Sequence, residues 1–301
     1  MKNAALFLAA SLSAAVPATL NGAPPPLPEG TVVRTDVAYV DDAHPRQKLD
    51  LYVPKHPPGQ KLPVLLWVHG GAWLGGSKDH APLEFLPHGY AVVSVGYRLS
   101  HHAVFPAQIQ DCQAAVRWVR AHAAGLDLDP DRIAAWGASA GGHLVALLGT
   151  AADEKSFAIG PHAAVSARVT CVVDYFGPTD LARMEEQDSP EFGTMDHLAP
   201  DCPESKLLGG PILENKAKAD KASPIFYVTK DDSPMLLVHG DRDPLVPHRQ
   251  SVTFAEALRK AGVPVTLHTA PGAGHGNGFG PREHKAVEEF LARHLKDRKE
   301  D

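Results

Sequence analysis

The chain has 301 residues, which fits one large α/β domain or two small ones, and a hydrophobic content of 44% supports a sizeable core. A formal net charge of −6 provides no basic face for nucleic acid, so no nucleic-acid partner is expected. The 17 histidines show no pairing with each other or with cysteine at metal-ligand spacing. We therefore expect neither a metal nor a cofactor.

The N-terminus has the three-part pattern of a signal peptide over residues 1–23. Lys2 gives a positive start, Ala4 to Val16 is apolar, and small residues suited to a cleavage site follow. The apolar stretch is too short to span a bilayer, so we expect an exported protein, periplasmic or extracellular, without a membrane span. The alternative is a buried N-terminal helix. A proline-rich tail at 24–30 then precedes a single domain at 31–301.

The three cysteines, Cys112, Cys171 and Cys202, are an odd number. In an exported protein they allow one disulfide and one thiol, and the spacing does not select the pair. Cys171 lies in an apolar run, which favours a small buried side chain.

Hydrophobic periodicity predicts strands and helices in alternation along the domain. The first two strands are expected to be antiparallel, and the later ones are apolar runs typical of strands buried on both faces. We expect strands at 31–39, 47–53, 62–68, 90–97, 169–175, 235–238 and 264–269, and helices at 81–86, 106–124, 251–261 and 283–295. The fold class is therefore α/β, a mostly parallel central sheet with helices on both faces.

Two segments interrupt this alternation. Residues 127–131 are predicted to form a loop that leads into a short strand before Ser139. Residues 177–232 lose periodicity, and we expect a cap-like insertion, irregular or helical, over the site rather than a separate domain.

A serine lies at the apex of a predicted strand-turn-helix, in the sequence Gly137-Ala138-Ser139-Ala140-Gly141. The two glycines let strand and helix approach closely around a strained serine. The turn should expose the Ser139 hydroxyl at the sheet edge, with the Ala140 N–H beside it. A simple helix N-cap is the alternative, but a cap does not need both glycines.

Further chemically active side chains follow other strands, and the carboxyl ends of parallel strands meet at one edge of a sheet. There, Ser139 would be a nucleophile activated by His275 as base, with Asp243 orienting the imidazole. The candidates that compete with these two partners are Asp241, His248, His268 and His284.

The loop after residues 62–68 reads His69-Gly70-Gly71-Ala72-Trp73. An oxyanion needs donors fixed in advance, and the backbone N–H groups of Gly71, Ala72 and Ala140 are the candidates. Trp73 either binds substrate in the cleft or packs beneath the loop, and both interpretations stay open.

The His-Gly-Gly-Ala-Trp loop and the Gly-x-Ser-Ala-Gly-Gly-His-Leu turn resemble those of α/β-hydrolases of the esterase/lipase group. The similarity is to the small feruloyl and acetyl-xylan type carboxylesterases, and it covers about residues 31–297. It implies a serine carboxylesterase of short-chain or aryl esters, with acetyl or feruloyl esters on plant polysaccharide as the expected substrates. The family pattern His-Gly-x-x-Asp-Pro-Leu-Val-Pro selects Asp243 over Asp241. Ala138 and Trp73 depart from the lipase-like relatives, which disfavours long-chain lipids.

Two other functions compete with this interpretation. Formamidase relatives share a His-Gly-Gly-x-Trp loop and the same triad, so hydrolysis of amides or formamides is the second enzymatic hypothesis. A non-catalytic binding protein on the same fold is the third, although such proteins typically lack a triad member. Acyl and alcohol specificity and oligomeric state stay open.

Overall fold

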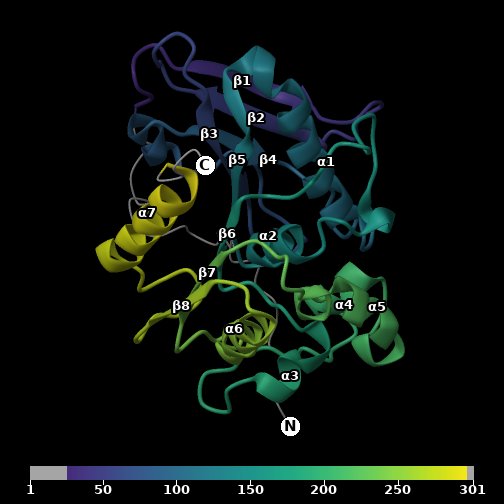
Figure 1. The fold of residues 1–301 in the computed structure, drawn as a ribbon. Helices are drawn as coiled ribbons and strands as arrows, with labels where there is room; N and C mark the ends of the chain where they lie inside the picture. The colour runs from purple at the N-terminus through teal and green to yellow at the C-terminus, as the bar shows by residue number, and fades with distance from the viewer. Residues whose placement is uncertain (1–25, 297–301) are drawn as a thin grey trace.

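The computed structural model describes residues 26–296, and the predicted signal peptide at 1–23 lies outside the described residues. A single eight-stranded sheet forms the centre, in the order β1-β2-β4-β3-β5-β6-β7-β8 (Figure 1). β2 pairs antiparallel with β1 and with β4, and the other neighbours are parallel. The strands are β1 (Val32–Ala38), β2 (Lys48–Val53), β3 (Leu62–Val68), β4 (Ala91–Val95), β5 (Leu128–Ala138), β6 (Cys171–Tyr175), β7 (Met235–Gly240) and β8 (Val265–Ala270).

Helices cover both faces of the sheet, which explains why β3 is apolar at every position. Val64 and Leu66 pack in one core with α1 (Ala107–His122), α2 (Ala140–Thr150) and α6 (Arg249–Ala261). Leu65 and Trp67 point to the opposite face and pack with α7 (Pro281–Leu295) and the 3-10 helix η1 (Leu83–His88). Successive side chains of a strand face opposite sides, so a strand between two helical layers buries both sets. The predicted α/β class with a mostly parallel sheet is confirmed.

The segment between β6 and β7 contains short helices rather than a second sheet. They are α3 (Met184–Gln187), α4 (Pro203–Leu208) and α5 (Lys216–Ala222), with 3-10 turns η4 (Leu181–Arg183), η5 (Ile212–Glu214) and η6 (Pro224–Tyr227). The carbonyl of Ala222, at the end of α5, bonds to the side chain of His143 in α2. This contact joins the segment to α2, the helix that follows Ser139.

Two local predictions were wrong. Of the predicted loop at 127–131, only Asp127 is a turn, because β5 already begins at Leu128, which is buried and pairs with Leu62. The register between β3 and β5 shifts just after this pair, and β6 pairs with β5 only from Ala134 onward. The polar residues 129–132 therefore lie at an end of β5 that has few strand partners. The helix expected at 81–86 is a 3-10 helix two residues later, η1, ended by Gly89 in the left-handed region. The other element bounds agree with the prediction within two residues.

The cysteines form no disulfide, because Cys112 and Cys202 are both free thiols and all three side chains are buried. Burial raises the pKa of the Cys202 thiol to about 11. No helix within residues 26–296 is long and apolar enough to cross a bilayer.

Candidate active site

Ser139 lies in a strained turn between β5 and α2, with φ 57° and ψ −121°. A positive φ is costly for a residue with a side chain, and surrounding contacts must hold it. Its N–H donates to the Tyr175 carbonyl at 2.8 Å, and its carbonyl accepts from the His143 N–H at 3.0 Å. A Cβ on Gly137 would collide with the Gly141 carbonyl, and a Cβ on Gly141 with the Val68 carbonyl. Both glycines are therefore required by close backbone approach.

The structure brings Ser139, His275 and Asp243 together, although they lie far apart in the sequence. His275 Nε2 is 2.9 Å from Ser139 Oγ, and His275 Nδ1 is 2.7 Å from Asp243 Oδ2. A carboxylate only accepts hydrogen bonds, so Nδ1 carries the proton and Nε2 is free to accept from the serine hydroxyl. This is the geometry of a nucleophile, a base and the group that orients the base.

Asp243 is almost fully buried, 3% exposed, and every contact favours its ionised form. Its Oδ1 accepts from the N–H groups of Leu245 and Val246 at 2.8 and 2.9 Å. Burial alone raises the pKa of this carboxyl, but hydrogen bonds from His239 and His275, and their charges, hold it well below its ordinary value. Asp243 therefore stays an acceptor for the His275 ring.

The competing candidates lie elsewhere. Asp241 accepts the Gly272 N–H at 2.7 Å and stabilises the loop before His275. His248 bonds to Thr269, His268 to Glu283, and His284 to Glu288. None of these side chains contacts Ser139.

The loop after β3 holds backbone in unusual conformations. Gly71 has φ 110°, and Ala72 and Trp73 have φ 55° and 56°. The Gly71 carbonyl turns back to accept from the N–H groups of Leu74 and Gly75, both at 2.9 Å. Within the described residues, the N–H groups of Gly71, Ala72 and Ala140 donate no hydrogen bond. These three predicted donors are thus available to an incoming oxygen.

Arg46, in the connection between β1 and β2, braces this loop and was not predicted from the sequence. Its Nη2 donates to the Gly76 carbonyl at 2.7 Å and lies 3.1 Å from His69 Nε2. The His69 Nδ1–H donates to the Gly70 carbonyl at 2.7 Å, so Nε2 is the acceptor. Burial lowers the pKa of His69 to about 4, which keeps the ring neutral in this role.

Trp73 is 2% exposed, yet it also lines the cavity above Ser139. Its indole Nε1–H donates to His143 Nδ1 at 3.2 Å, and the His143 Nε2–H donates to the Ala222 carbonyl at 2.6 Å. Trp73 therefore packs under the loop and links it to the segment between β6 and β7. Its role in substrate binding stays a prediction.

His143 should make folding stability fall with acidification. Burial lowers its pKa from 6.5 to about 4, so between these values the unfolded chain binds a proton that the folded chain does not. Stability is therefore lost as pH falls from 6.5 toward 4, by about 2–3 kcal/mol for this group. Urea unfolding at pH 7.5 and at pH 4.5 would measure the free energy of unfolding at each pH. The decrease between the two pH values should be about 2–3 kcal/mol smaller in His143→Gln than in the wild type. The exposed control, His101→Gln, should keep the wild-type loss, and an unchanged loss in His143→Gln would contradict the assignment.

A partly open cavity of about 40 Å³ lies over Ser139. This is room for roughly three water molecules, which suits a small acyl group. Its wall combines the site with the segment between β6 and β7, and consists of Ala72, Trp73, Ser139, Ala140, Pro178, Met195, Pro203, Glu204, Leu245, Val246 and His275. Glu204 was not predicted, because it lies in the segment without periodicity. Among residues 26–296, no group of three His, Cys, Asp or Glu side chains could hold a metal.

The mostly parallel sheet and the strained serine turn at the carboxyl end of β5 define an α/β-hydrolase. The chain belongs to the BD-FAE family, whose profile matches residues 49–258. It is 34% identical to Esterase LipQ of Mycobacterium tuberculosis over 72% of its own length. It spans about half of that relative, 51%. These matches place the chain in a family of α/β-hydrolases whose named relatives include esterases.

Solved structures agree with this class. A truncated carbohydrate esterase from gut microbiota superposes with a TM-score of 0.79 and 32% identity, covering 88% of this chain and 97% of that one. An acetyl ester-xyloside bifunctional hydrolase from Caldicellulosiruptor lactoaceticus gives a TM-score of 0.65 and 28% identity, with 89% and 94% covered.

Proposed function

We propose that this protein hydrolyses carboxylic esters of small acyl groups through an acyl-enzyme on Ser139. The observation that carries the proposal is the continuous hydrogen-bonded line from Asp243 through His275 to the Ser139 hydroxyl. His275 removes the hydroxyl proton as Ser139 attacks the ester carbonyl, and then gives it to the leaving alcohol. A water molecule, deprotonated by His275, then attacks the acyl-enzyme. The acid is released as Ser139 takes the proton back from His275. Asp243 keeps the ring in the required tautomer and stabilises the imidazolium.

The tetrahedral oxyanion is received by the free N–H groups of Gly71, Ala72 and Ala140. These donors are fixed before substrate arrives, because Arg46 and His69 brace one side of the loop and Trp73 the other. Preorganised donors gain their strength from needing no rearrangement as charge develops.

Gly71→Ala should lower kcat by about 10²–10³-fold, the effect of losing an oxyanion donor. A Cβ at this position would lie 2.6 Å from the Gly75 carbonyl oxygen, and φ is 110°, so the peptide must reorient. Steady-state kinetics with 4-nitrophenyl acetate would measure the loss. Gly59→Ala is the matched control, since it also has positive φ, 82°, but open space around it. Equal activity in both variants would contradict the role of the loop.

The proposed substrate class is acetyl esters on plant polysaccharide, with feruloyl esters as the aryl alternative. The cavity over Ser139 suits an acetyl group, and two structural neighbours are described as a carbohydrate esterase and an acetyl ester-xyloside hydrolase. A polymer substrate is also consistent with the export predicted from residues 1–23. The test is a panel of 4-nitrophenyl acetate, 4-nitrophenyl butyrate, acetylated xylan, methyl ferulate and N-formylkynurenine. Release of acetate from acetylated xylan supports the proposal, whereas activity confined to the formyl amide would replace it with amide hydrolysis.

A further inference from the structure

Glu204, at the start of α4, introduces a carboxylate into the wall of the cavity over Ser139. Its exposed fraction is only 3%. Apart from Ser139 and His275, the other described side chains in that wall are apolar, or have their polar group bound, as the Trp73 indole is. A buried charge in an apolar wall is costly unless its oxygens are paired. The hydrogen bonds of Glu204 therefore decide what the cavity can hold.

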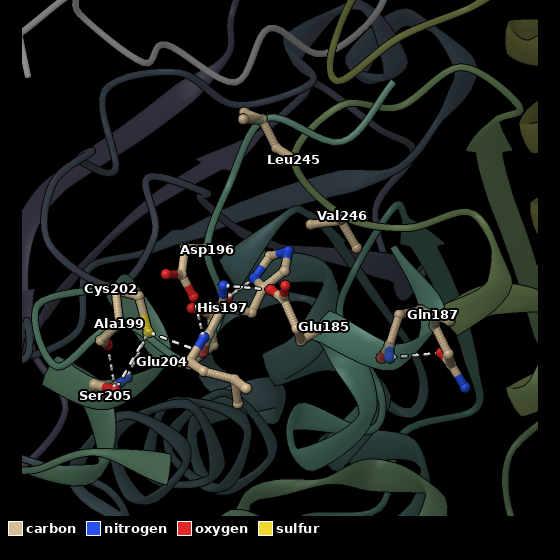
Figure 2. Close-up of polar contacts among 12 residues, drawn as sticks. Glu185, Gln187, Asp196, His197, Ala199, Cys202, Glu204, Ser205, Leu245 and Val246 are labelled. Atoms are coloured by element: carbon tan, nitrogen blue, oxygen red, sulfur yellow. Dashed lines mark hydrogen bonds and ion pairs between the residues drawn. The ribbon is translucent and has the colours of Figure 1, made fainter. Parts of the chain in front are cut away.

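One carboxylate oxygen of Glu204 is paired and the other is not. His197 Nδ1 lies 3.3 Å from Oε1, and the Cys202 thiol also interacts with this carboxylate (Figure 2). Within residues 26–296, Oε2 is buried and receives no hydrogen bond of normal geometry. The His197 backbone N–H donates to Glu185 at 3.0 Å, which fixes the residue beside Glu204. Burial lowers the pKa of His197, but the hydrogen bond and charge of Glu204, with Asp188 and Glu185, outweigh it and raise the pKa. The pair therefore holds Oε1 in place and leaves the hydrogen-bonding capacity of Oε2 unused.

Buried polar atoms without partners are rare, and each one needs an explanation, such as an ordered water, an ion or a catalytic role. In the wall of a substrate cavity, a ligand atom is a further candidate partner. The missing partner of Oε2 must be a hydrogen-bond donor. A hydroxyl group brings one donor, whereas an ammonium group brings three that must all be satisfied when buried. The cavity wall contains both Ser139 and Glu204, and Glu204 has one carboxylate oxygen that needs a single donor, so a hydroxyl group fits better than a cation.

We propose that Glu204 Oε2 accepts a hydrogen bond from a substrate hydroxyl close to the ester, so that the site selects partially acylated polyols and sugars over simple alkyl esters. This inference rests on the proposed esterase function and adds a specificity-determining residue to it. In this proposal, the segment between β6 and β7 recognises the hydroxyl group next to the scissile ester bond.

The test uses a matched pair of esters, trans-2-hydroxycyclohexyl acetate and trans-2-methoxycyclohexyl acetate. They differ in whether the neighbouring oxygen can donate a hydrogen bond. The full-length protein should hydrolyse the hydroxy ester with kcat/KM at least about tenfold higher, since hydrogen bonds to a charged group are the strong ones. In Glu204→Gln and Glu204→Asp, which respectively remove the charge and withdraw the oxygen, this ratio should fall toward 1. Glu191→Gln, on an exposed residue of the same segment, is the control and should keep the wild-type ratio.

The possible results distinguish a failure of this inference from a failure of the proposed esterase function. A wild-type ratio near 1 overturns the inference, as does a high ratio that persists in both Glu204 variants. Hydrolysis of 4-nitrophenyl acetate with none of either cyclohexyl ester also overturns it. Absence of activity on every ester, 4-nitrophenyl acetate included, instead refutes the proposed esterase. If circular dichroism shows that neither variant folds, the test rests on the wild-type ratio of kcat/KM for the two cyclohexyl esters. A ratio of at least about tenfold supports the inference, and a ratio near 1 overturns it.

Discussion

Ser139→Ala is expected to lower kcat for 4-nitrophenyl acetate by about 10⁵–10⁶-fold, the size of effect seen when a serine hydrolase loses its nucleophile. The variant keeps the oxyanion donors and His275 but cannot form the acyl-enzyme. The strained backbone at this position is the same for alanine as for serine, so the fold should persist.

Steady-state kinetics with a thermal unfolding curve would test this expectation. Ser156→Ala, on an exposed 3-10 turn, serves as the matched control and should keep wild-type activity. Turnover by Ser139→Ala at the wild-type rate would show that another group attacks the ester.

Asp243→Asn should lower kcat by about 10⁴-fold through the wrong tautomer of His275. The amide oxygen would still accept from the N–H groups of Leu245 and Val246, because they hold Oδ1 at 2.8 and 2.9 Å. The amide NH₂ then faces His275 Nδ1, which must become the acceptor. The ring proton moves to Nε2, and the Ser139 hydroxyl loses its base.

Asp241→Asn is the matched control. Asp241 lies two residues from Asp243 and is the other candidate in the sequence for the partner of His275. Among the residues that the structure describes, its carboxylate accepts a hydrogen bond from the Gly272 N–H alone, at 2.7 Å, and an amide oxygen can replace it. We expect less than about a threefold change in kcat. If Asp241→Asn lost activity and Asp243→Asn kept it, the two assignments would have to be exchanged.

The parts of the site that could be predicted are those set by short-range sequence. Gly137 and Gly141 flank the serine because the start of α2 approaches the backbone of β5 and the end of β3, and this requirement is visible as a local motif. The candidate residues Ser139, Asp243 and His275 could be brought to one sheet edge because parallel strands share their carboxyl ends. The hydrogen bonds between them needed the structure.

The parts that could not be predicted depend on contacts between distant segments. Arg46 braces the loop around Gly71 from the β1–β2 connection, and no local pattern distinguishes it from other surface arginines. Glu204 lies in a segment without hydrophobic periodicity, so its place in the cavity wall follows only from tertiary packing. The strand at Leu128 could not be predicted, because polar Asp129 and Pro130 follow it and its pairing with Leu62 joins distant segments.

The loop that carries the proposed oxyanion donors is held in place by contacts with several other parts of the chain. His69 and Arg46 hold its start and end, while Trp73 is bonded through His143 to the carbonyl of Ala222. Three parts of the chain therefore fix the direction of the Gly71 and Ala72 N–H groups. Such support explains how Ala72 and Trp73 keep a positive φ that isolated residues avoid.

Labelling with a fluorophosphonate probe, followed by peptide mass mapping, tests the central claim most directly. The probe reacts with a serine only when a base activates it and donors stabilise the charge that develops on the phosphoryl oxygen. The account predicts stoichiometric labelling of the peptide that contains Ser139, and none in Ser139→Ala. A well-folded protein that stays unmodified, or carries the label on another residue, would contradict it.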